Sequence, residues 1–181
     1  MKLRFIFFVI ALYCAATPAL AQHIAPTSFN SRILMSHNIE RARVGVPPLV
    51  WSESLAHNAQ SWADELARSR RFEHSPQQTG ATPQGENLWM GTAAAYSAEE
   101  MVQAWIDERA DFIPGIFPAN TRTGNWEGIA HYTQLIWRNT TQVGCALAHN
   151  QEDEYLVCRY SKAGNWFGED PFGKNVTHLR Q

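Results

Sequence analysis

The fold is decided by the stretch Gly128-Ile-Ala-His-Tyr-Thr-Gln-Leu-Ile-Trp-Arg-Asn-Thr140, with Val143-Gly-Cys-Ala146 and Tyr155-Leu-Val-Cys-Arg-Tyr-Ser-Lys-Ala-Gly-Asn-Trp166 behind it. An ionisable residue, His131, stands just before an apolar and aromatic run. Cys145 and Cys158 follow, each inside a segment typical of a β-strand. A hairpin that turns at Gln151 and Glu152 would place the two cysteines opposite each other.

The N-terminus predicts export of the chain. Lys2 and Arg4 form a short basic start, residues 5–16 are apolar, and Ala19-Leu20-Ala21 is a small-x-small cleavage site. This order is that of a secretory signal peptide covering residues 1–21. The apolar run is shorter than the ~20 residues that a membrane-spanning helix needs, so we expect no transmembrane segment. The expected location is extracellular, or periplasmic in a bacterium.

Removal of the signal peptide changes the charge and the cysteine count. Without Lys2 and Arg4, 13 basic residues remain against 17 acidic ones, a net charge of −4. This mildly acidic net charge does not predict a nucleic-acid-binding protein, because such proteins carry a basic surface. Residues 22–181 suit one domain with a proper core. Cys14 leaves with the signal peptide, and an even cysteine count in an exported protein favours a disulfide. The alternative of a metal-binding or catalytic cysteine pair fits no zinc-ligand spacing.

Helical periodicity and strand patterns alternate along the mature chain. The expected helices span residues 31–43, 52–70, 97–111 and, more briefly, 131–137. Strands are expected at 87–91, 143–148 and 155–161. Residues 112–128 are rich in Pro, Gly and Asn and are expected to form a long loop. Ser97 and Glu100 form a capping box at the start of the third helix. Helices interspersed with a few antiparallel strands predict a layered α+β fold.

The chain resembles the CAP superfamily of cysteine-rich secretory, antigen 5 and plant pathogenesis-related class 1 proteins, which share the SCP domain. Besides the opening stretch, the resemblance rests on His37-Asn-Ile-Glu-Arg41 and Gly85-Glu-Asn-Leu88. The motifs keep the family's order across residues 30–171. One departure is Lys162, where the family more often has proline. The resemblance implies a three-layer α-β-α sandwich around a small, mainly antiparallel sheet, with a disulfide at the positions of Cys145 and Cys158.

Four ionisable residues match the central cleft of that family: His74, Glu86, Glu108 and His131. The resemblance, and not their spacing, groups them. Neutral His74 and His131 are suited to bind a divalent metal such as Zn²⁺, with a carboxylate or water completing the coordination. A His–Glu pair is also suited to acid–base chemistry. A third reading is structural, in which the carboxylates hold main-chain amides or orient the imidazoles.

Other polar residues have simpler interpretations. Ser75 follows His74, but it lies in no Gly-x-Ser-x-Gly elbow, and we do not expect a catalytic serine. His37 lies on a helix stripe and is expected to be a hydrogen-bonded interior residue. Asn38 and Arg41 are expected to tie the first helix to the rest of the fold. Trp89 and Trp126 are expected near the cleft.

Three classes of function follow from the resemblance. The leading one is a binding protein that holds a sterol, fatty acid or other small lipid, or an extracellular glycan or protein. A metal-assisted or acid–base hydrolase is the first alternative, although the chain lacks a compelling nucleophile. A defence or signalling ligand for a protein partner is the second. No cofactor is required by the leading class, and a divalent cation is the candidate; we expect a binder more than an enzyme.

Overall fold

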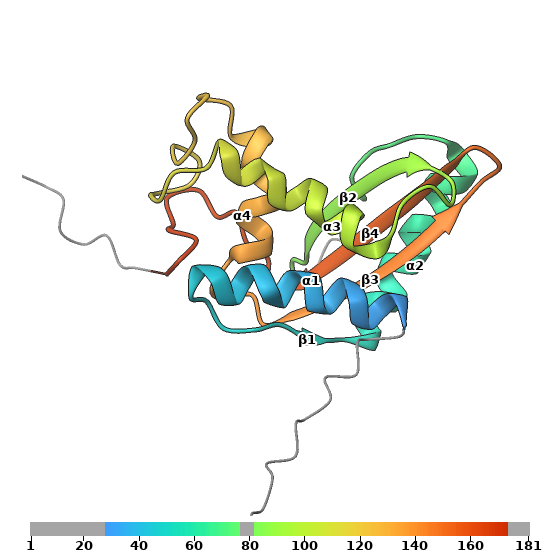
Figure 1. Ribbon diagram of the computed structural model, residues 1–181, viewed down its shortest axis with the longest axis horizontal. Helices are drawn as coiled ribbons and strands as arrows, with labels where there is room; N and C mark the ends of the chain where they lie inside the picture. Colours follow the sequence, from blue (N-terminus) through green and yellow to red (C-terminus); the bar gives the residue numbers. More distant parts are fainter. Residues whose placement is uncertain (1–27, 77–81, 174–181) are drawn as a thin grey trace, which may run out of the picture.

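The computed structural model describes residues 28–76 and 82–173, so the expected signal peptide lies outside the described residues. A four-stranded sheet forms the middle layer. Helix α2 (Glu53–Ser69) covers one face of the sheet, while α1 (Phe29–Val44), α3 (Ala98–Asp107) and α4 (Ala130–Ile136) lie on the other (Figure 1). The predicted α+β, three-layer α-β-α architecture is confirmed.

The sheet runs in the order β1-β3-β4-β2. Its strands are β1 (Val50–Trp51), β2 (Gly85–Thr92), β3 (Gln142–His149) and β4 (Asp153–Ser161). β4 pairs antiparallel with both β2 and β3, and β1 pairs parallel with β3. The sheet is therefore mainly antiparallel, as expected. β1 was not predicted, because two residues are too short for a periodic pattern.

Side-chain caps set where the helices begin. Ser28 accepts from the amide of Ser31, so α1 starts before the predicted residue 31, and Gly45 ends it in the left-handed conformation at φ 76°. The capping box of Ser97 and Glu100 is present. The third helix was predicted to run to residue 111. It ends at Asp107 and continues as a 3₁₀ turn over Glu108–Ala110, and that change of pitch positions the Glu108 side chain.

Two short segments refine the loop predicted at 112–128. Phe112 and Thr121 form an isolated antiparallel bridge, and a second 3₁₀ turn, Trp126–Ile129, leads directly into α4. Helix α4 corresponds to the short helix predicted at 131–137 and begins and ends one residue earlier. Among the residues that the structure describes, no helix could cross a lipid bilayer.

Arg41 ties α1 to the rest of the molecule. Its side chain is fully buried and, among the residues that the structure describes, donates only to main-chain carbonyl oxygens: those of Pro47 at 2.7 Å, Leu135 at 2.8 Å, and Trp137 and Thr140 at 3.0 Å. Burial lowers the pKa of Arg41 to about 10, which still leaves it charged at neutral pH. The Leu135 carbonyl lies in the last turn of α4, and those of Trp137 and Thr140 follow its end, where a cation also interacts favourably with the helix dipole.

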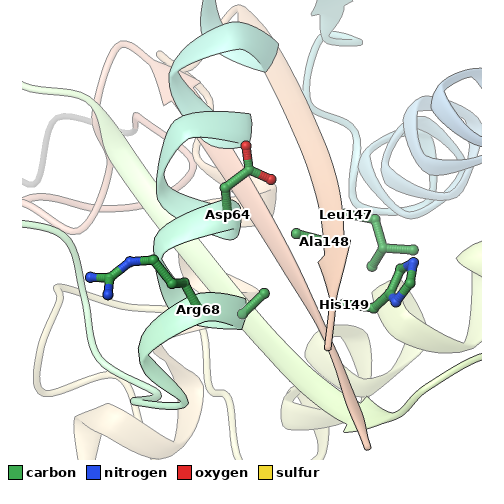
Figure 2. A pocket seen from close by; sticks show the side chains of 6 residues that line it. Asp64, Arg68, Leu147, Ala148 and His149 are labelled. Atoms are coloured by element: carbon green, nitrogen blue, oxygen red, sulfur yellow. The ribbon is translucent and has the colours of Figure 1, made fainter. Parts of the chain in front are cut away.

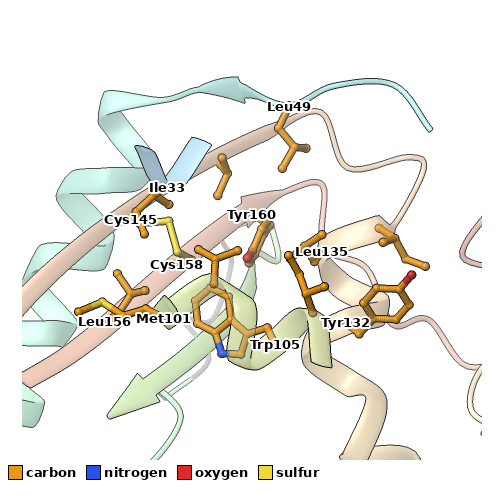
Figure 3. Packing of buried hydrophobic residues seen from close by; sticks show 14 of the residues in the cluster. Ile33, Leu49, Met101, Trp105, Tyr132, Leu135, Cys145, Leu156, Cys158 and Tyr160 are labelled. Atoms are coloured by element: carbon orange, nitrogen blue, oxygen red, sulfur yellow. A yellow bond between two sulfur atoms is a disulfide. The ribbon is translucent and has the colours of Figure 1, made fainter. Parts of the chain in front are cut away.

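Two apolar clusters fill the space on either side of the sheet. The larger one joins α1, α3 and α4 to the sheet and contains Cys145, Cys158, Trp105 and Tyr160 (Figure 3). The smaller one joins α2 to residues of β2, β3 and β4. The predicted disulfide is present, and Cys145 stands opposite Cys158 in the β3–β4 register. Loop closure over such a short stretch stabilises the fold by roughly 3 kcal/mol in the chain-entropy model.

A buried polar chain crosses the larger cluster. His37 donates from Nδ1 to the Ile33 carbonyl at 2.8 Å and accepts at Nε2 from the Tyr160 hydroxyl, also at 2.8 Å. The Asn87 amide in turn donates to the Tyr160 oxygen at 3.2 Å. This arrangement requires a neutral imidazole. Burial, assisted by the charge of Arg41, lowers the pKa of His37 to about 4.

We predict that His37 makes the protein acid-sensitive. The folded pKa of about 4 lies below the ordinary value of 6.5, so the unfolded chain binds more protons between these values. The free energy of unfolding should therefore fall by about 3 kcal/mol as the pH is lowered through this window. Urea unfolding at a series of pH values measures it. His37→Gln should flatten the slope, and an unchanged slope in that variant would contradict the assignment.

We predict that Gly144→Ala destabilises the fold. A Cβ atom at Gly144 would lie 2.3 Å from the Ala56 nitrogen and 2.4 Å from the Ser52 oxygen, because the start of α2 packs directly on β3. Backbone atoms cannot move aside cheaply, so the loss should be about 1–3 kcal/mol by chemical denaturation. Gly128→Ala is the matched control, since a Cβ there meets nothing within 4 Å. Equal stability of the two variants would refute the close approach.

Candidate functional site

The first of two His–Glu pairs lies at the beginning of β2. His74 Nδ1 is 2.5 Å from Glu86 Oε1, and the amide of Ser75 donates to the same oxygen at 3.1 Å. On the next strand, Arg159 stands directly opposite Glu86 and brings its Nη2 within 2.9 Å of Oε2. The Glu86 side chain is 8% exposed and that of His74 63% exposed. A nearly buried carboxylate therefore anchors an imidazole that reaches solvent.

The charge of Glu86 is maintained despite its burial. Burial alone would raise the pKa of this carboxyl group, but the hydrogen bond with His74 and the nearby charge of Arg159 outweigh it, with help from the Ser75 amide. The net effect is a pKa below the ordinary value of a glutamate. Glu86 is thus an anion at neutral pH and accepts a hydrogen bond from Nδ1 of His74.

The second pair joins α4 to the 3₁₀ turn after α3. His131 Nδ1 lies 2.5 Å from Glu108 Oε1, while the other carboxylate oxygen of Glu108 accepts from the Tyr132 amide at 3.0 Å. The carboxylate therefore orients the imidazole and also satisfies a free amide in the first turn of α4. Both side chains are partly buried, with His131 30% exposed.

Trp105 holds the second imidazole from its flat side. Its ring lies 6.1 Å from that of His131, centroid to centroid, at an interplanar angle of 19°. The Trp105 Nε1 donates to the Leu88 carbonyl at 3.0 Å, which fixes the indole against β2. His131 is thus constrained by a stacked ring and by a carboxylate. Within the described residues, His74 is constrained by a carboxylate and has no stacked ring.

The two pairs flank neighbouring residues of β2. Glu86 belongs to the first pair, and the side chain of Asn87 donates to the main-chain oxygen of His131 at 3.0 Å. Because side chains alternate along a strand, residues 86 and 87 point to opposite faces of the sheet. The structure therefore places the four residues grouped by resemblance as two pairs, one on each side of the edge strand β2.

Both imidazoles use Nδ1 for their carboxylate, which leaves Nε2 of each free of protein partners within the described residues. Metal-binding histidines have this arrangement, in which a carboxylate fixes the tautomer and the other nitrogen faces the ion. Within residues 28–76 and 82–173, no group of three or more His, Cys, Asp or Glu side chains is placed to hold a metal. The two Nε2 atoms of His74 and His131 could supply at most two protein ligands to a metal ion.

Several important contacts were not predicted from the sequence. Neither Arg159 nor Trp105 was expected at the site. Arg159 lies on the expected strand 155–161, but Glu86 lies one residue before the expected strand 87–91, so their cross-strand pair was not predicted. Ser75 contributes its amide to Glu86, and its hydroxyl has no hydrogen bond to a histidine within the described part of the chain. Trp126, expected near the cleft, packs against Phe117 and Phe167.

A separate hollow of about 470 Å³ lies between α2 and the far end of β3. Asp64 and Arg68 reach it from the helix, and Leu147, Ala148 and His149 from the strand (Figure 2). Asp64 already accepts from Gln60, and Arg68 pairs with Glu65 on the same helix. This hollow contains none of the four residues of the two pairs.

Comparisons with known proteins agree with the fold. Residues 34–160 match the model of the cysteine-rich secretory protein family, CAP. The chain is 35% identical over 147 residues to the pathogenesis-related protein PR-1 of Medicago truncatula, covering 80% of each chain. It is 37% identical over 140 residues to pathogenesis-related protein 1A of Nicotiana tabacum, covering 77% of this chain and 78% of the relative. The crystal structure of NaASP2 with Zn²⁺ has a similar fold, with a TM-score of 0.65 and 23% identity over 82% of this chain and 87% of that one.

Proposed function

Because this chain belongs to the cysteine-rich secretory protein (CAP) family, we propose that it is a secreted binding protein whose cleft holds a divalent metal ion through His74 and His131. The signal-peptide pattern of residues 1–21 and the disulfide between Cys145 and Cys158 support secretion. Zinc is the preferred ion, since it is commonly bound by neutral imidazole.

The observation that carries the metal proposal is the hydrogen-bonding pattern that the two imidazoles share. In each pair a carboxylate accepts from Nδ1 at 2.5 Å, and Nε2 remains free for an ion. A structural role alone would not require the same nitrogen to be free in both pairs. The similar fold of a protein crystallised with Zn²⁺ adds support of a general kind.

Two imidazoles leave the preferred four-coordinate shell of zinc incomplete. Water or a donor atom of a bound ligand must supply the rest, so the site would be weak and exchangeable. A bound ion would contribute Lewis acidity to the cleft. Glu86 and Glu108 would hold the imidazoles in their binding tautomer, and Arg159 would keep Glu86 ionised. We propose binding without catalytic turnover as the function of this site.

We predict that the wild-type protein binds zinc in a calorimetric titration and that His74→Ala/His131→Ala abolishes this binding. Glu86→Gln and Glu108→Gln should each weaken it by about 10- to 100-fold, the usual effect of losing a carboxylate behind a metal-binding histidine. His149→Ala is the matched control, because His149 is exposed at the end of β3 and lines the separate hollow that contains none of the four paired residues. Circular dichroism should show that all variants remain folded.

Equal zinc affinity in the wild type and the double variant would refute the site. The same proteins also test the enzymatic alternative. Hydrolysis of an ester or peptide substrate that disappears in the double variant would make the protein a metal-assisted hydrolase, and our proposal of binding alone would be wrong.

The lipid or sterol ligand that the family resemblance implies stays a separate prediction. An apolar ligand held between helices does not need the ionic groups of the cleft. Cholesterol or a fatty acid should therefore bind saturably to the wild type and, with the same affinity, to His74→Ala/His131→Ala. Fluorescent-ligand displacement measures both affinities. No saturable binding across sterols, fatty acids and phospholipids would exclude the carrier function.

A further inference from the structure

A polar pocket of about 610 Å³ lies on the α2 face of the sheet and includes the first His–Glu pair in its lining. Asn58, Ser61 and Trp62 line it from α2, and Glu86 and Arg159 from the sheet. The remaining lining residues are His74, Ser75, Pro76, Thr82, Pro83 and Gln84. We propose that this pocket binds an uncharged oligosaccharide, a function beyond the metal binding of the two histidines.

The charges of the pocket cancel. Arg159 and Glu86 are the two permanently ionised side chains among its described lining residues, and they face each other across 2.9 Å. The carboxylate would repel a polyanion and the guanidinium a polycation, so neither is selected. This balance favours a ligand that is polar and has no net charge.

The hydrogen-bonding groups suit a ligand rich in hydroxyl groups. The side-chain amides of Asn58 and Gln84 have no hydrogen-bond partner within the described residues, and each carries donors and an acceptor. Nη1 of Arg159 likewise has no acceptor within the described residues, while its Nη2 lies 2.9 Å from Glu86 Oε2. A purely apolar ligand would cover these groups without pairing them, which is costly.

Trp62 supplies a flat apolar wall. Its Nε1 donates to the Glu73 carbonyl at 3.1 Å, and its ring packs against the α2-side apolar cluster. The indole is therefore fixed in place with its polar atom already satisfied. A pyranose ring has an apolar C–H face and a rim of hydroxyl groups, so it can stack on Trp62 while its rim reaches Asn58 and Arg159. A tryptophan ring beside side-chain amides and one guanidinium group therefore suits an uncharged oligosaccharide.

The test begins with a glycan array probed with the full secreted protein. Calorimetry with neutral β-linked tetrasaccharides, namely cellotetraose, laminaritetraose and chitotetraose, then measures affinity, with heparin as the polyanion. At least one neutral sugar should bind saturably. Trp62→Ala should weaken that binding by about tenfold or more, the loss of one stacked ring. Asn58→Ala should weaken it as well, and because Asn58 is exposed this variant should fold normally.

Trp166→Ala is the matched control and should bind as the wild type does. Trp166 is also a partly exposed tryptophan whose Nε1 donates to a nearby carbonyl, that of Ala163, but it lies outside the pocket. His131 lies outside the pocket lining, so His131→Ala should weaken zinc binding while retaining the sugar, which separates this proposal from the metal site. Heparin or peptide binding without any neutral sugar, or full sugar binding in both Trp62→Ala and Asn58→Ala, would overturn it.

Discussion

The buried guanidinium of Arg41 is the constraint on which the arrangement of the larger helical layer depends. Within the described part of the chain it has no carboxylate partner, and main-chain carbonyls from the segment after α1 and from the end of α4 hold it. An ion buried in this way is tolerated only when its donors are satisfied, and removing its acceptors would leave an expensive unpaired charge. The contact therefore fixes the end of α4 relative to α1. His131 lies at the other end of that short helix, so its position follows from the same contact.

The two His–Glu pairs share chemistry but differ in rigidity. His131 is confined by the Trp105 ring and by a carboxylate that also holds the Tyr132 amide. His74 is far more exposed, and its order comes from one carboxylate that is itself fixed by Arg159. A ligand that engages both imidazoles would meet one preformed group and one that adapts. Part of the entropic cost of ordering His74 would therefore arise only when the ligand binds.

Local signals explain what the sequence predicted well. The capping box of Ser97 and Glu100, and the hairpin that aligns Cys145 with Cys158, depend on signals close together in the sequence. The family resemblance, in turn, grouped the four ionisable residues that the structure places in two pairs. Contacts between distant segments were not predictable in the same way. The pairing of Arg159 with Glu86 requires the register of β2 against β4, and the stacking of Trp105 on His131 requires the crossing of α3 and α4. No periodic pattern contains either piece of information.

The location of the disulfide determines how the protein would respond to a reducing environment. Cys145 is 2% exposed and Cys158 is fully buried, and both lie in the cluster between the sheet and the helices. A thiolate must approach a sulfur atom directly to exchange with it, and the covering side chains block that approach. Reduction must therefore wait until this layer opens. The lifetime of the bond in excess thiol would report how often the molecule opens, whatever the equilibrium potential of its surroundings.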